Sequence, residues 1–98
     1  MANVHNVRTG IETARADMAS RSAQRERVRV AIADTKRILE RQQALFAPGL
    51  LPRSEVETTQ TAYDTAVAQY HAAQADVEAA ETKLRATQAQ LMAAEAQV

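Results

Sequence analysis

The feature that most constrains the fold is a seven-residue repeat of apolar residues in both halves of the chain. The repeat comprises Val4, Ile11, Met18, Arg25, Ile32, Leu39 and Phe46, then Val56, Tyr63, Tyr70, Val77, Leu84, Leu91 and Val98. A second, mostly smaller set follows three positions later: Val7, Ala14, Arg21, Val28, Thr35 and Gln42, then Thr59, Ala66, Ala73, Ala80, Thr87 and Ala94. A narrow seam of this period is typical of a left-handed coiled coil, so each half is predicted to be one long helix.

The residues that break helices are concentrated at the middle of the chain. They are Pro48, Gly49 and Pro52, and the one other glycine is Gly10. Proline restricts the residue before it and removes a backbone donor, so the first helix is predicted to end near Phe46. Ser54 and Glu57 have the spacing of a capping box, which predicts that the second helix starts at Ser54. Gly10 is expected to weaken the first turns without ending the helix.

Folding the chain back at this turn aligns the two seams. Phe46 then faces Val56, and the layers continue to Val4 facing Val98, with large residues opposite large ones. The small set aligns in the same way, as in Ala14 opposite Thr87. The sequence therefore predicts an all-α fold, an antiparallel two-helix coiled-coil hairpin that forms a single domain over residues 1–98. Its helices would cover about 3–46 and 54–97, joined by a turn at 47–53, in a rod about 65 Å long.

Charge is divided unequally between the two halves. Residues 1–47 hold nine basic and five acidic side chains, whereas residues 54–98 hold two basic and seven acidic ones. A basic helix beside an acidic helix is self-complementary, either within one hairpin or between neighbouring hairpins placed side by side.

A basic run in the first half has two interpretations. The run comprises Arg21, Arg25, Arg27 and Arg29. It could bind nucleic acid through phosphates. However, Arg21 and Arg25 fall on the seam within one turn of Glu78 and Glu81, so ion pairs within the hairpin are the favoured prediction, and no nucleic-acid partner is expected.

The sequence offers little from which to build an active site or a metal site. It has no cysteine, and the two histidines, His5 and His71, are far apart in the predicted register. No Gly-rich loop is present to hold a phosphate, and no nucleophile has a base at a suitable spacing. We therefore expect no enzymatic activity, no metal and no cofactor. The longest uncharged stretch, residues 42–52, is too short to span a bilayer, and no secretory signal is expected at the N-terminus.

Large apolar residues also gather at the turn, outside the regular part of the seam. They are Leu45, Phe46, Leu50 and Leu51. An apolar patch at the end of a rod indicates a docking surface, although such residues can also cap the end of the seam. Capping is the favoured prediction for Phe46, and both roles stay open for the three leucines.

The turn and its flanks, residues 41–57, read RQQALFAPGLLPRSEVE. This stretch resembles the tip of the α-helical hairpin in periplasmic adaptor proteins, the membrane fusion proteins of the HlyD family. The heptads that follow it resemble the descending helix of that hairpin. In that family the tip carries an arginine, a leucine four residues on and a serine seven further. Arg41 and Leu45 match this pattern, whereas Pro52 stands at the serine position and Ser54 lies two residues later.

The resemblance implies a function and a location. The partner-binding tip would comprise Arg41, Leu45, Leu50, Leu51, Pro52 and Ser54, and it would dock onto a TolC-type outer-membrane channel. The parent adaptor, commonly in six self-associated copies, would link that channel to an inner-membrane transporter of a tripartite efflux or secretion pump in the periplasm. The chain would then be a hairpin excised from a larger, membrane-associated adaptor. The alternative is a generic coiled-coil scaffold or a nucleic-acid-binding arm of a larger protein.

Overall fold

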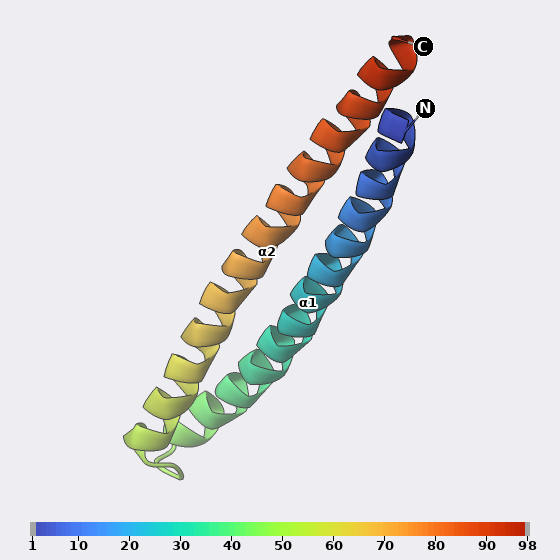
Figure 1. The fold of residues 1–98 in the computed structure, drawn as a ribbon. Helices are drawn as coiled ribbons and strands as arrows, with labels where there is room; N and C mark the ends of the chain where they lie inside the picture. The colour runs from blue at the N-terminus through green and yellow to red at the C-terminus, as the bar shows by residue number, and fades with distance from the viewer. Residues whose placement is uncertain (1, 98) are drawn as a thin grey trace.

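The computed structural model describes residues 2–97, which form two helices packed as a hairpin (Figure 1). Helix α1 spans Ala2–Phe46 and helix α2 spans Arg53–Ala96. Both termini lie at one end of the rod and the turn lies at the other. The predicted fold class, an all-α antiparallel helical hairpin, is confirmed, and each helix bound lies within one residue of its predicted position. The predicted layer of Val4 and Val98 lies outside the described residues because it includes Val98.

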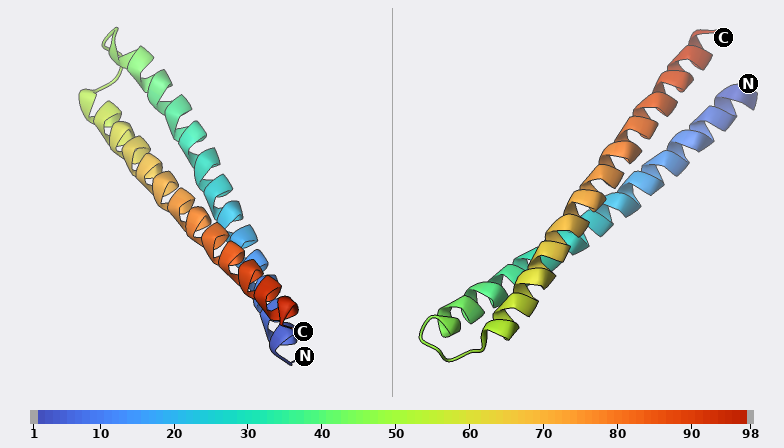
Figure 2. Two further views of the ribbon diagram at one scale, coloured as in Figure 1. Left: turned by 90° about the horizontal axis from the view of Figure 1, so that it is seen from above. Right: turned by 90° about the vertical axis from the view of Figure 1, so that its left-hand side faces the viewer.

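The hairpin is a thin rod. The Cα atoms of the described residues span 74 × 14 × 13 Å, so this part of the chain has the thickness of two helices in contact. The helices lie side by side in Figure 1 and cross in the right-hand view of Figure 2, as two coiled helices do. Neither helix within residues 2–97 combines the length and the hydrophobicity that crossing a membrane requires.

The core is the predicted seam. The nine buried apolar residues all occupy seam positions: Ile11, Ala14, Val28 and Leu39 of α1, and Ala66, Ala73, Val77, Ala80 and Ala94 of α2. Val77, only 1% exposed, is the most deeply buried of them. The remaining described seam positions, including Tyr63 and Tyr70, are half-buried, except that Arg21 and Phe46 are exposed. Because five of the nine core residues are alanine, the helices pack closely but bury little apolar area per layer.

Contacts between the helices agree with the predicted register. Arg8 Nη2 lies 3.3 Å from Glu95 Oε1, next to the predicted layer of Val7 and Ala94. Gly10 lies beside Thr87, one turn from the predicted partner Ala14. The helix runs without interruption through Gly10, as predicted.

Candidate functional site

The tip of the hairpin is shaped by the way α1 ends. The amide of Gly49 donates to the carbonyl of Phe46 and the amide of Leu50 donates to the carbonyl of Leu45, both at 2.9 Å. Gly49 has a φ of +81°, the left-handed conformation that a glycine adopts without strain. This pair of hydrogen bonds and the left-handed glycine define a Schellman motif. The motif ends α1 and sets Leu50 next to its last turn, and residues 47–52 complete the reversal into α2.

The start of α2 differs from the prediction. The helix begins at Arg53 after Pro52, whose φ of −65° and ψ of 145° give it an extended conformation, and no side chain caps the first turn. The predicted capping box of Ser54 and Glu57 is therefore wrong. Pro52 has taken the flanking position, and its carbonyl accepts the amide of Glu55 at 3.2 Å, so Ser54 already lies inside the helix. Glu55 is the acidic residue in the first turn, where the helix dipole favours it.

The four apolar residues at the tip divide into two groups. Leu51 is half-buried, as expected of a residue that caps the seam. Leu50 is 72% exposed, Leu45 39% and Phe46 36%, so these three present apolar surface to solvent. The prediction that Phe46 caps the seam is only partly correct, because more than a third of it remains accessible. The tip therefore carries an exposed apolar cluster, defined here as Leu45, Phe46 and Leu50.

Two arginines border this apolar cluster. The guanidinium of Arg53 lies over the ring of Phe46, with its carbon 5.8 Å from the ring centroid, within the range of a cation–π contact. Arg41 is exposed and lies one turn before Leu45 on the same face of α1. Within residues 2–97 Arg41 makes no hydrogen bond or ion pair. Its five donors are thus available to carbonyl or carboxylate oxygens of a partner.

Arg53 is the tip residue that the sequence analysis missed. An arginine in the first turn of a helix faces the positive end of the helix dipole and is slightly unfavourable there. The sequence feature that could have identified Arg53 is its position. It comes directly after the turn, where it can meet Phe46, the last aromatic residue of α1. The cation–π contact with Phe46 explains why an arginine lies at this position.

A shallow groove lies on the side of the turn. It is lined by Gln42, Ser54, Glu55, Thr58 and Thr59. Ser54 is exposed and its carbonyl accepts the hydroxyl of Thr58, while Gln42 Oε1 is buried without a hydrogen-bond partner among the described residues. A buried acceptor of this kind gains from any donor that reaches it. The groove therefore presents an unpartnered polar acceptor beside the turn.

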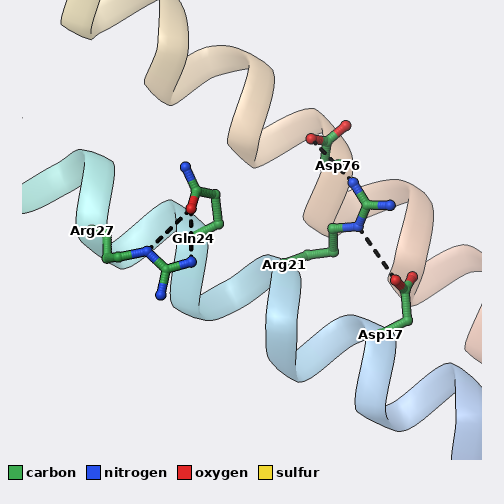
Figure 3. Close-up of polar contacts among 5 residues, drawn as sticks. All are labelled: Asp17, Arg21, Gln24, Arg27 and Asp76. Atoms are coloured by element: carbon green, nitrogen blue, oxygen red, sulfur yellow. Dashed lines mark hydrogen bonds and ion pairs between the residues drawn. The ribbon is translucent and has the colours of Figure 1, made fainter.

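The charged side chains of the shaft bind one another, although not in the predicted pairs. Arg21 lies 3.4 Å from Asp17 and 3.6 Å from Asp76 (Figure 3), rather than meeting Glu78 or Glu81. Although it occupies a seam position, Arg21 is exposed. Together with the small Ala80 and with Asp17 and Asp76 it lines a shallow pocket on the shaft, and its long side chain reaches the two carboxylates there. An ion pair within the hairpin is therefore present, with Asp76 as the partner across the seam.

Arg25 meets Glu78 only indirectly. Its guanidinium donates to Gln74 Oε1 at 3.0 Å, and the amide nitrogen of Gln74 donates to Glu78 Oε1 at 3.3 Å. Because Arg25 is half-buried, the neutral amide of Gln74 satisfies it without placing a carboxylate in the seam. The bridge links α1 and α2 near the middle of the rod.

The other two arginines of the basic run bond to neighbours on α1. Arg27 donates twice to Gln24 Oε1 (Figure 3), and Arg29 forms an ion pair with Glu26. The hydrogen bond from Arg29 lowers the pKa of the Glu26 carboxyl below its usual 4.5 and raises that of the Arg29 guanidinium. Any stability from this pair is present above pH 4.5 and is lost as the pH falls through the lowered pKa of Glu26. Because both groups are fully exposed, the contribution is small.

Nothing in the described part of the chain forms a metal centre. No three His, Cys, Asp or Glu side chains within residues 2–97 converge on a point that could hold an ion. Comparison of the chain with protein-family models, curated proteins and solved structures finds no match. The resemblance to an adaptor tip accordingly rests on the sequence of residues 41–57 alone.

Proposed function

We propose that this chain is the α-helical hairpin of a periplasmic adaptor in a tripartite efflux or secretion pump. Its tip would dock onto a TolC-type outer-membrane channel, and other domains of the adaptor would reach an inner-membrane transporter. The observation that carries the proposal is the exposed cluster of Leu45, Phe46 and Leu50 at the end of the rod, bordered by Arg41 and Arg53.

The chemistry of this tip suits the ends of a helical channel. Exposed backbone carbonyls at helix C-termini and nearby carboxylates attract arginine donors, while grooves between helices accept leucine side chains. A cluster of large apolar side chains at the end of a rod is the usual mark of a protein contact. Ser54, in the groove beside the turn, would supply a polar contact near the position where the family has its serine.

The shaft suits assembly rather than recognition. Its basic helix and its acidic helix would let neighbouring hairpins pack side by side, as in an adaptor of several copies. All four arginines of the basic run bond to carboxylate or amide groups within the hairpin: Arg21, Arg25, Arg27 and Arg29. These contacts support a role in assembly over nucleic-acid binding.

Binding to a purified TolC-type channel tests the proposal. The immobilised 98-residue chain should bind the detergent-solubilised channel, and Leu45→Asp combined with Arg41→Ala should abolish binding while circular dichroism stays unchanged. The matched control is Arg8→Ala, which removes an exposed arginine at the opposite end of the rod and should have no measurable effect, since surface pairs contribute about 0 to 1 kcal/mol. Binding that survives the double substitution but is lost with Arg21→Ala would place the docking surface on the shaft and refute the proposal.

A further inference from the structure

Helix α1 carries a second line of apolar residues that the hairpin leaves uncovered. Ala31, Ile38 and Leu45 recur every seven residues, outside the seam, and all three are exposed, with Ile38 at 37%. Asp34 and Arg41, both exposed, alternate with them. Residues three, four and seven apart share one face of a helix, so these five form a continuous strip, called here the 31–45 stripe.

The 31–45 stripe is symmetric in its chemistry about Ile38. Four residues before Ile38 lies an acid, Asp34, and three residues after it lies a base, Arg41. Seven residues before and after it lie two apolar residues, Ala31 and Leu45. If a second copy of α1 packs antiparallel with Ile38 against Ile38, Arg41 of each copy meets Asp34 of the other and Leu45 meets Ala31.

The charges of the stripe favour this antiparallel pairing. A parallel pairing in register would set Asp34 against Asp34 and Arg41 against Arg41, which repels. In the antiparallel arrangement each attractive pair occurs twice, because a two-fold axis repeats every contact. Arg41 has no partner of its own within residues 2–97, whereas Asp34 Oδ1 accepts from Arg37. A carboxylate has two oxygens, so Asp34 can accept from Arg41 of the second copy as well.

We propose that the 31–45 stripe is the interface of an antiparallel dimer of this chain, in which the tip halves of two hairpins overlap with a two-fold axis at Ile38. The dimer covers Arg41 and Leu45 of both copies. If the proposed function holds, the dimer therefore withholds part of the docking tip until a competing partner separates the copies. The dimer itself does not depend on that function.

Cysteine crosslinking tests the position of the two-fold axis. The chain contains no cysteine, so Ile38→Cys introduces a single thiol that lies opposite its own copy in the proposed dimer. Mild oxidation should give a covalent dimer at concentrations where sedimentation shows the parent chain to be dimeric. The control is Met92→Cys, near the opposite end of the rod, where the side chain is 72% exposed and thus more accessible than Ile38; this variant should stay monomeric under denaturing conditions. A parent chain that sediments as a monomer up to millimolar concentration overturns the proposal, as does a dimer in which Ile38→Cys fails to crosslink.

A charge exchange tests the pairing of Asp34 with Arg41. Asp34→Arg alone and Arg41→Asp alone should each weaken dimerisation roughly tenfold, because each creates two like-charge contacts. The double variant Asp34→Arg with Arg41→Asp should recover most of the parent affinity. Glu26→Arg is the matched control. It breaks the ion pair with Arg29, three positions on, which resembles the pair of Asp34 with Arg37. Because Glu26 lies off the stripe, this substitution should leave dimerisation unchanged.

The charge exchange overturns the proposal if the double variant dimerises no better than the single ones, or if Glu26→Arg weakens the dimer equally. Assembly into larger rings with no effect of these substitutions would indicate side-by-side packing instead. None of these measurements involves a channel, so failure of the dimer and failure of tip docking are observed separately.

Discussion

At the scale of single residues, the two glycines of this chain have opposite effects on the stability of the hairpin. Gly49 adopts a φ of +81°, which costs other residues roughly 1 kcal/mol or more. Gly10 lies in helical backbone, and a Cβ built there would meet Thr87 Cγ2 at 3.6 Å, an ordinary van der Waals distance. Glycine is therefore required at the turn, whereas in α1 it only lowers the helix propensity.

Alanine substitutions at the two glycines should thus shift stability in opposite directions. Gly10→Ala should raise the free energy of unfolding by about 1 kcal/mol, through helix propensity and contact with Thr87. Gly49→Ala should lower it by about 1 kcal/mol. Urea unfolding followed by circular dichroism measures both, and a shift in the same direction for the two variants would contradict this account.

The bridge between Arg25 and Gln74 is the half-buried polar contact between the helices. Gln74→Ala should lower the free energy of unfolding by about 1 kcal/mol, because it leaves donors of Arg25 without an acceptor. Gln24→Ala removes the same side chain from an exposed position where it accepts from Arg27 on the same helix, and it should cost less than half as much. Equal losses in urea unfolding would show that burial of the Arg25 contact does not matter.

At the scale of helices, the periodicity of apolar residues predicted both elements because a seam of this width specifies a helix and its inward face together. The end of α1 could also be predicted, because Pro48 sets it. The start of α2 was predicted to within one residue, but its cap was not, since Pro52 is pre-organised to flank the helix and Ser54 lies two positions inside that cap. At this helix start, the restricted backbone of Pro52 determined the N-cap position, and a side-chain cap by Ser54 did not form.

This difference gives a test at Ser54. A serine that caps a helix contributes roughly 1 kcal/mol relative to alanine. Ser54 makes no capping bond, so Ser54→Ala should change the free energy of unfolding by much less than that. A loss of the full capping energy in thermal or urea unfolding would instead indicate that the capping box forms in solution.

At the scale of the whole molecule, the sequence predicted the register because large residues face large ones along both seams. The candidate tip was predicted only in part. The resemblance pointed to Arg41 and Leu45, whose spacing places them on one helix face, but the exposure of Leu50 beside the half-buried Leu51 depends on the Schellman motif. Which of two adjacent leucines points to solvent is decided by the turn geometry and not by composition.

Disulfide trapping tests the register over the full rod. Ile11→Cys with Leu91→Cys should form a crosslink within one chain, because the predicted register sets these two positions opposite each other. Ile11→Cys with Val56→Cys should not, since Val56 lies at the start of α2, by the turn, and Ile11 lies near the open end. The opposite result, measured by gel mobility under dilute oxidising conditions, would refute the antiparallel register.

The contacts that join the helices differ in how much chain they enclose. The bridge from Arg25 to Gln74 closes 49 residues, and the contact from Arg8 to Glu95 closes 87. If made independently, the outer contact costs about 0.5 kcal/mol more in loop-closure entropy. If the layers nearer the turn have already formed, the contact between Arg8 and Glu95 encloses only a little additional chain. The entropic cost of forming the hairpin is therefore lowest when its layers form in order from the turn outward. In that order the tip acquires its final shape before the open end closes.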